Sequence, residues 1–163
     1  MREIKFRGKS LLDSKWYYGF YYNMDDSRIG ERRHIIRWEN NGPGRQNIEE
    51  PIDPKTLGQY IGIKDIYGKK VFRGDIVKVK EIVYASCYRE EVGEIREFTG
   101  EVVWKNHGWH IAKKIENGVR YHSLWLWNIE DDSMEIIGNI YDNPELLKDI
   151  TLEIEEPTTD QSK

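Results

Sequence analysis

Aromatic and aliphatic side chains alternate with polar ones along most of the chain, in short runs with a period of two. The most aromatic run is residues 16–22. Successive side chains of an extended strand point to opposite faces, so this run places four aromatic residues on one face, namely Trp16, Tyr18, Phe20 and Tyr22. A strand that is aromatic on both faces is either buried on both sides or exposes one side to a partner.

Further strand-like runs follow at residues 4–8, 34–38, 56–64, 70–79, 100–104, 109–111, 115–121 and 134–140. Turn signals separate them, because Gly68 and the Gly74-Asp75 pair favour sharp changes of direction. Residues 105–108 and Asn117-Gly118 are successive hairpin signals and predict a meander. Residues 84–97 are polar and weakly patterned, and we expect an excursion between strands there. The pattern as a whole predicts a mainly β fold.

The C-terminal part carries a helix signal followed by a polar tail. Asn143 is placed to cap a helix, Pro144 to occupy its first position and Glu145 to lie in its first turn. We therefore expect a short C-terminal helix. Residues 151–163 contain too few apolar side chains to order themselves, and we expect a disordered acidic tail.

A loop or linker rich in Gly, Pro and Asn is expected at residues 39–47, so a domain boundary is expected near residues 40–56. This predicts an N-terminal β-rich extension or small subdomain at residues 1–50 and a second unit at residues 51–150. Whether residues 1–50 form a domain or a strand-swapping arm stays open.

Composition supports β structure and restricts the class of protein. The 163 residues include 20 Ile and 8 Val against 8 Leu and 2 Ala, and β-branched side chains fit a pleated sheet better than a helix. The single Cys87 cannot form an internal disulfide. Neither a long apolar run nor a secretory signal is apparent, which predicts a cytoplasmic protein without a membrane partner.

Charge is distributed unevenly along the chain. The net charge is −4, with +5 over residues 1–129 and −9 over residues 130–163. A mildly basic body is compatible with contact to nucleic acid. A solvated surface with an acidic tail explains the same asymmetry, and this second interpretation is favoured.

No pattern of reactive side chains points to catalysis. The four His residues and Cys87 do not occur at a zinc-ligand spacing. The Ser residues occupy no glycine-flanked elbow, and the glycines match neither a phosphate-binding loop nor a dinucleotide fingerprint. We therefore expect a non-enzymatic protein with no catalytic residues, metal or cofactor.

The strongest candidate for a binding surface combines arginines with aromatic residues. Its members are Trp16, Tyr18, Arg28, Arg32, Arg33, Arg37 and Trp38. Arginine beside aromatic rings suits the backbone and bases of single-stranded nucleic acid. The alternative is that the aromatic strand belongs to the core and that the arginines form a solvated face beside it. Both interpretations stay open, and this alternative is favoured. The many Trp and Tyr residues also suit a protein interface, since both types are enriched there.

Three blocks of this sequence resemble the YopX-like family. They are Ile4-Lys5-Phe6-Arg7-Gly8-Lys9, the stretch from Ile52-Asp53-Pro54 to Val77, and the stretch from Glu135 to Leu147, which includes Ile137-Gly138-Asn139-Ile140-Tyr141-Asp142. The resemblance extends over nearly residues 1–150. It implies a phage or prophage origin, unknown function and an SH3-like barrel in residues 51–150, and it carries no residue roles. Ile61-Gly62 and Ile137-Gly138 are interpreted as first and last strands that pair to close this barrel.

These observations rank two hypotheses. The first is a phage or prophage accessory protein that acts as a protein-interaction module, binds a host or phage protein and forms a homo-oligomer. The second is a single-stranded nucleic-acid-binding protein that uses the arginine and aromatic surface.

Overall fold

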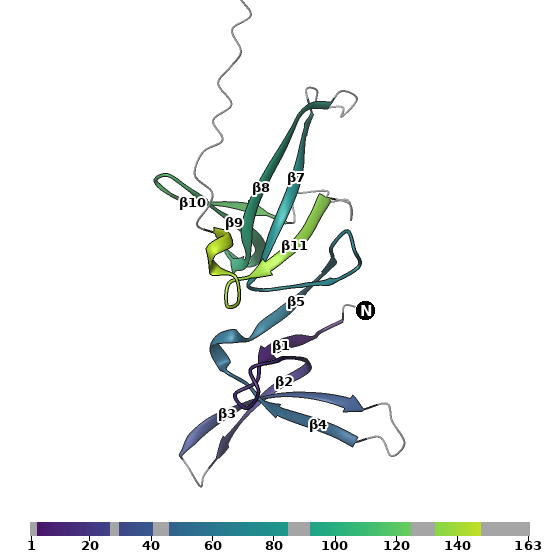
Figure 1. The fold of residues 1–163 in the computed structure, drawn as a ribbon, viewed down its shortest axis with the longest axis vertical. Helices are drawn as coiled ribbons and strands as arrows, with labels where there is room; N and C mark the ends of the chain where they lie inside the picture. The colour runs from purple at the N-terminus through teal and green to yellow at the C-terminus, as the bar shows by residue number, and fades with distance from the viewer. Residues whose placement is uncertain (1–2, 27–29, 41–45, 85–91, 125–132, 148–163) are drawn as a thin grey trace, which may run out of the picture.

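The computed structural model describes residues 3–26, 30–40, 46–84, 92–124 and 133–147. Strands dominate these residues and form two antiparallel sheets, so the predicted mainly β class is confirmed (Figure 1). The described part of the chain contains no helix with the length and apolar character needed to span a membrane.

The first sheet contains six strands in the order β4-β3-β2-β1-β5-β6. Their bounds are β1 (Phe6–Lys9), β2 (Trp16–Asp26), β3 (Glu31–Asn40), β4 (Gln46–Pro51), β5 (Gly58–Lys64) and β6 (Lys70–Phe72). Strand β1 pairs with β2 on one side and with β5 on the other. Strands from both sides of residue 51 therefore share this sheet, while the division of the chain into domains stays a prediction.

The second sheet contains five strands in the order β10-β9-β8-β7-β11. Their bounds are β7 (Asp75–Tyr84), β8 (Val92–Lys105), β9 (Gly108–Ile115), β10 (Gly118–Ser123) and β11 (Met134–Asn139). Both predicted hairpins are present, as β8–β9 and β9–β10. Asn106 and His107 have φ values of 48° and 65°, the left-handed conformation that tight hairpin turns require.

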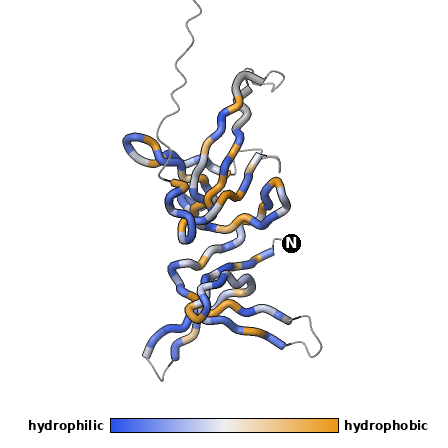
Figure 2. The backbone as a smooth tube through the Cα atoms, viewed as in Figure 1, coloured by the Kyte–Doolittle hydropathy of each residue, from blue (hydrophilic) through white to orange (hydrophobic). Residues whose placement is uncertain are grey.

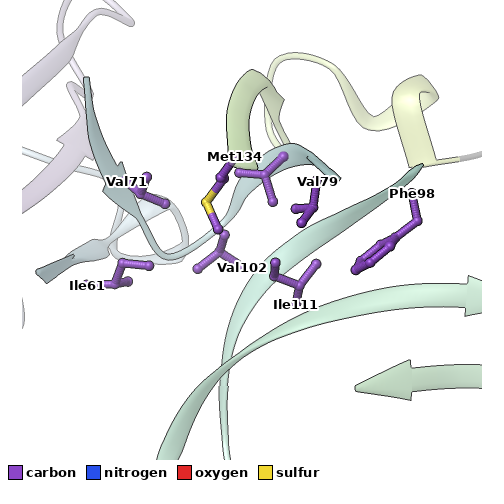
Figure 3. Packing of buried hydrophobic residues seen from close by; sticks show 8 residues of the cluster. Ile61, Val71, Val79, Phe98, Val102, Ile111 and Met134 are labelled. Atoms are coloured by element: carbon purple, nitrogen blue, oxygen red, sulfur yellow. The ribbon is translucent and has the colours of Figure 1, made fainter. Parts of the chain in front are cut away.

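The main hydrophobic core joins the two sheets. Its buried members come from β5, β6, β7, β8, β9 and β11 (Figure 3), namely Ile61, Val71, Val77, Val79, Phe98, Val102, Ile111 and Met134. In the middle of β7, Val77 and Val79 are buried whereas Lys78 and Lys80 are exposed, as expected for a strand with one buried face. Figure 2 shows hydrophobic and hydrophilic stretches mixed along the strands of this sheet. The β5–β6 hairpin of the first sheet thus packs against the second sheet.

Several local predictions are wrong, because strand pairing extends through polar segments. Residues 39–40 still belong to β3 and residues 46–47 already belong to β4, although both fall in the predicted linker. The expected excursion at residues 84–97 contains the start of β8. Cross-strand pairing overrides weak local patterning in such ribbons.

The predicted barrel closure and terminal helix differ from the observed arrangement. The strand with Ile61-Gly62 pairs with β1 and β6, and the strand with Ile137-Gly138 pairs with β7, so the predicted pairing of these two strands is wrong. Over the described ranges, the ladders form two open sheets. Pro144–Leu147 forms one turn of 3-10 helix where a short helix is predicted. The predicted tail at residues 151–163 lies outside the described residues.

Candidate functional site

One face of β2 exposes large apolar side chains to solvent. Tyr18 is 44% exposed, Phe20 is 67% exposed and Met24 is 48% exposed, and all three occupy alternate positions of the same strand. Tyr22 lies between them in the same phase and is partly buried. The alternation of the sequence thus produces a row of apolar side chains along one strand.

Strand β3 adds two arginines to this row. Phe20 is paired with Arg37, and Met24 is paired with Arg33. Directly opposed residues of an antiparallel pair project from the same face of the sheet. We call this surface the outer aromatic face, and its members are Tyr18, Phe20, Tyr22, Met24, Arg33 and Arg37.

Both arginines of the outer aromatic face have a carboxylate nearby. Arg33 Nη1 lies 3.6 Å from Asp26 Oδ2, and Arg37 Nε lies 3.9 Å from Glu49 Oε1. Burial and a hydrogen bond with Glu49 raise the pKa of the Tyr22 hydroxyl. The face is therefore aromatic, with positive and negative groups interspersed.

Two members of the predicted arginine and aromatic surface lie on the opposite face of the sheet. Arg32 Nε donates to Asp25 Oδ1 at 2.9 Å, and this hydrogen bond raises the pKa of Arg32. Trp38 stacks on Tyr17 with ring centroids 5.1 Å apart. The predicted surface is thus divided between two faces, because Arg32 and Trp38 are out of phase with Arg33 and Arg37. Arg28 lies outside the described residues.

The side chain of Trp16 is partly buried, because it packs against the segment that follows β11. Its indole Nε1 donates to Asp142 Oδ2 at 2.7 Å, and its ring lies 5.8 Å from that of Tyr141. Lys9 Nζ donates to Asp142 Oδ1 at 2.6 Å. The start of β2 is therefore tied to the second sheet.

A buried ion pair lies beside Trp16. Arg7 Nη1 is 2.5 Å from Asp75 Oδ1, and the two side chains are only 7% and 2% exposed. Asp75 Oδ2 also accepts a hydrogen bond of 2.7 Å from the Phe72 amide. Burial raises the pKa of the Asp75 carboxyl, while Arg7 and the Phe72 amide act in the opposite direction. The Arg7 guanidinium lies 4.7 Å from the centroid of the Trp16 ring.

We call this set of contacts the junction, with members Arg7, Lys9, Trp16, Asp75, Tyr141 and Asp142. It unites the three blocks that carry the family resemblance, since Arg7 and Lys9 come from the first, Asp75 from the second and Asp142 from the third. The polar side-chain atoms of the junction bond to residues that are far away in the sequence. The three blocks therefore meet at the junction, where they connect the two sheets.

The junction predicts a specific loss of stability in acid. Hydrogen bonds from Lys9, Asn139 and Trp16 hold the pKa of the Asp142 carboxyl at about 2, below its ordinary value of 3.8. A carboxyl with a lowered pKa stabilises the folded state above its unfolded pKa, and this stabilisation is lost as pH falls from about 4 to about 2. The shift corresponds to roughly 2 kcal/mol, and solvent screening reduces this to about 1 kcal/mol.

The measurement is urea denaturation of the wild-type protein and Asp142→Asn between pH 2 and pH 6. We expect the free-energy difference between the two proteins to shrink as pH falls through this window. A difference that stays constant with pH would contradict the role of the ionised Asp142 carboxylate.

Sequence reasoning missed Phe20 and Met24 as surface residues. The available signal was their phase, because both share the face of Tyr18 in an alternating run. In the described part of the chain, no group of three or more His, Cys, Asp or Glu side chains is arranged to hold a metal ion.

Comparisons with known proteins give a family and a similar solved structure. The chain matches the model of the YopX protein family over residues 5–148. Its fold is similar to the crystal structure of protein EF1440 from Enterococcus faecalis, with 19% identity and a TM-score of 0.41, over 90% of this chain and 99% of that chain. No curated protein matches the sequence.

Proposed function

The chain belongs to the YopX family, and from its outer aromatic face we propose that it is a non-enzymatic protein-interaction module that binds a second copy of itself. The observation that carries the proposal is the exposure of Phe20, at 67%, in line with the exposed side chains of Tyr18 and Met24. Aromatic and Met side chains are enriched at protein interfaces and provide much of their binding energy.

The charges of this face favour a second copy as the partner. A two-fold interface brings the same patch together from both subunits, so the patch must be complementary to itself. Each of the two arginines of the outer aromatic face lies within 4 Å of a carboxylate, Arg33 of Asp26 and Arg37 of Glu49. Their separations of 3.6 and 3.9 Å are longer than the 2.9 Å of the Arg32–Asp25 pair on the opposite face. Because these pairs are long, the arginines of one subunit are suited to pair instead with the carboxylates of the other subunit.

The same charges weigh against nucleic acid as the ligand of this face. Residues 16–51 contain five basic and six acidic side chains, a net charge of −1. Phosphate binding depends on basic side chains whose charge is available to replace counterions. Arg32, Arg33 and Arg37 each lie within 4 Å of a carboxylate instead.

Size-exclusion chromatography with light scattering tests the proposal. We expect the wild-type protein to be a dimer or larger, and Phe20→Ser to shift it to the monomer, because a polar side chain removes the apolar centre of the face. Tyr67→Ser is the matched control, since Tyr67 is 75% exposed in the turn between β5 and β6.

A wild-type monomer at all concentrations would contradict self-association. A pull-down from nuclease-treated host lysate then tests the broader proposal, with wild-type and Phe20→Ser proteins as bait. The absence of any protein captured by the wild type and lost with Phe20→Ser would overturn the protein-interaction module as well.

The remaining family expectations are part of this proposal. An SH3-like barrel in residues 51–150 is supported by the shared core of β5, β6, β7, β8, β9 and β11. A phage or prophage origin, a cytoplasmic location and a host or phage partner are supported by the family resemblance alone.

A further inference from the structure

A row of directly paired residues crosses the whole second sheet, from β11 to β10. Its members are Gly138, Ile76, Glu101, Ala112 and Tyr121. Directly opposed residues project from the same face of a sheet. The core residues Val77, Val102 and Ile111 are their neighbours in sequence and therefore project from the opposite face. We call the face that carries the row the far face of the second sheet.

The β11 end of the row is covered by the turn that follows β11. A Cβ atom at Gly138 would lie 2.8 Å from Leu146 Cδ1, so Leu146 packs on Gly138 from the far face. Ile76, the next residue of the row, is fully buried. The 3-10 turn η3 (Pro144–Leu147), yellow in Figure 1, also contacts β8. The chain therefore reaches Leu147 on the far face.

The β10 end of the same row is open to solvent. Tyr121 is 40% exposed, and Val119, which projects from the same face, is 44% exposed. Lys114 is paired with Val119 on one side of the row, and Lys105 lies on the other side, beside Gly108. Lys105 Nζ is 3.3 Å from the centroid of the Tyr121 ring. The open half of the far face is thus a small apolar surface between two lysines.

Glu101, in the middle of the row, acts on one of these lysines. Burial raises the pKa of the Glu101 carboxyl, whereas Arg73 and Lys114 act in the opposite direction. Among the described residues, however, neither Lys105 nor Lys114 has a carboxylate within 4 Å, so both amines keep donors for a further acidic group. The open half therefore favours a partner that is apolar on one side and acidic on the other.

The sequence that continues from Leu147 has this pattern. Ile150, Leu152 and Ile154 occupy alternate positions, and Glu153 and Glu155 occupy the opposite phase. In an extended segment, the three apolar side chains would share one side and the two glutamates the other. Seven extended residues span about 24 Å, whereas the distance from β8 to β10 is about 10 Å. Residues 148–154 are therefore long enough to cross the open half.

We infer that residues 148–154 dock on the open half of the far face of the same molecule. The apolar side chains of the segment pack on Val119 and Tyr121, and its glutamates pair with Lys105 and Lys114. The segment alone has few apolar side chains, and the far face supplies the apolar contacts that it lacks. This docking is separate from the proposed self-association, which uses the first sheet.

Zero-length cross-linking of the full chain with a carbodiimide tests the inference, because it joins a carboxylate to a lysine in direct contact. Unlabelled and nitrogen-15-labelled proteins are unfolded in urea and refolded as a mixture, so that mass spectrometry separates links within one molecule from links between copies. We expect links from the glutamates of the segment to Lys105 and Lys114 within one molecule. Lys113 is the internal control, since it is the neighbour of Lys114 but projects from the opposite face, and we expect a much lower yield there.

Two variants test the apolar part of the contact. Leu152→Ser/Ile154→Ser keeps every charge of the segment and is expected to lower the yield of links to Lys114 at least about tenfold, because the apolar burial is lost. Ile115→Ser is the matched control, since Ile115 is 42% exposed on the opposite face of the same hairpin, and it is expected to leave the yield unchanged. Circular dichroism of each variant checks that it is folded.

Four results would overturn the inference. They are the absence of any link from the segment to Lys105 or Lys114, equal yields at Lys113 and Lys114, and a yield that Leu152→Ser/Ile154→Ser leaves unchanged. The fourth is links that form only between copies, which would assign the far face to the C-terminal segment of a second copy. Self-association through the first sheet is judged separately by Phe20→Ser, so the two proposals fail independently.

Discussion

Replacing Asp75 with alanine is expected to lower the free energy of unfolding by about 3–5 kcal/mol, the cost of removing one partner of a buried ion pair. The variant leaves the Arg7 guanidinium 7% exposed with no carboxylate to balance its charge. It also removes the acceptor of the Phe72 amide. Urea denaturation at neutral pH measures the change.

Two comparisons make this prediction specific. The double variant Arg7→Met/Asp75→Leu replaces both charges with apolar side chains and is expected to be much closer to the wild-type stability than Asp75→Ala. Glu97→Ala removes two exposed ion pairs, Glu97 with Lys78 at 2.7 Å and with Lys80 at 3.3 Å, and is expected to cost much less than Asp75→Ala because solvent screens exposed pairs. A loss for Asp75→Ala no larger than that for Glu97→Ala would contradict a structural role for the buried pair.

The local features of the fold could be predicted from the sequence because local residues determine them. Gly68 and Gly74 have φ values of 75° and 82°, so both predicted turns use the freedom of glycine. The Asn117-Gly118 signal marks the β9–β10 hairpin. Alternation along residues 16–22 correctly placed Tyr18 and Phe20 on one face.

Features that depend on distant parts of the chain could not be predicted in this way. Asp75 was interpreted only as part of a corner, because nothing near it in the sequence identifies Arg7 as its partner. Likewise, the arginines of β3 formed a single basic group in the sequence. Their separation onto two faces follows from strand phase, but their neutralisation depends on Asp25, Asp26 and Glu49, which strand pairing brings close.

Ile111→Ala is expected to lower the free energy of unfolding by about 2–5 kcal/mol, because Ile111 is fully buried in the core between the sheets and its truncation leaves a cavity. Ile36→Ala, at a fully buried position of the first sheet, is expected to cost a similar amount. Comparing these two variants tests whether the two sheets unfold together.

Because β5 and β6 contribute Ile61 and Val71 to the core of the second sheet, and the junction ties β1 and β2 to the segment after β11, we expect one cooperative transition in both variants. Circular dichroism and tryptophan fluorescence should then give coincident urea curves, and amide exchange should accelerate in β3 and β9 alike. If Ile36→Ala accelerated exchange in β3 and left β9 unchanged, the first sheet would unfold on its own. Residues 1–50 would then behave as an independent unit, despite the pairing of β1 with β5.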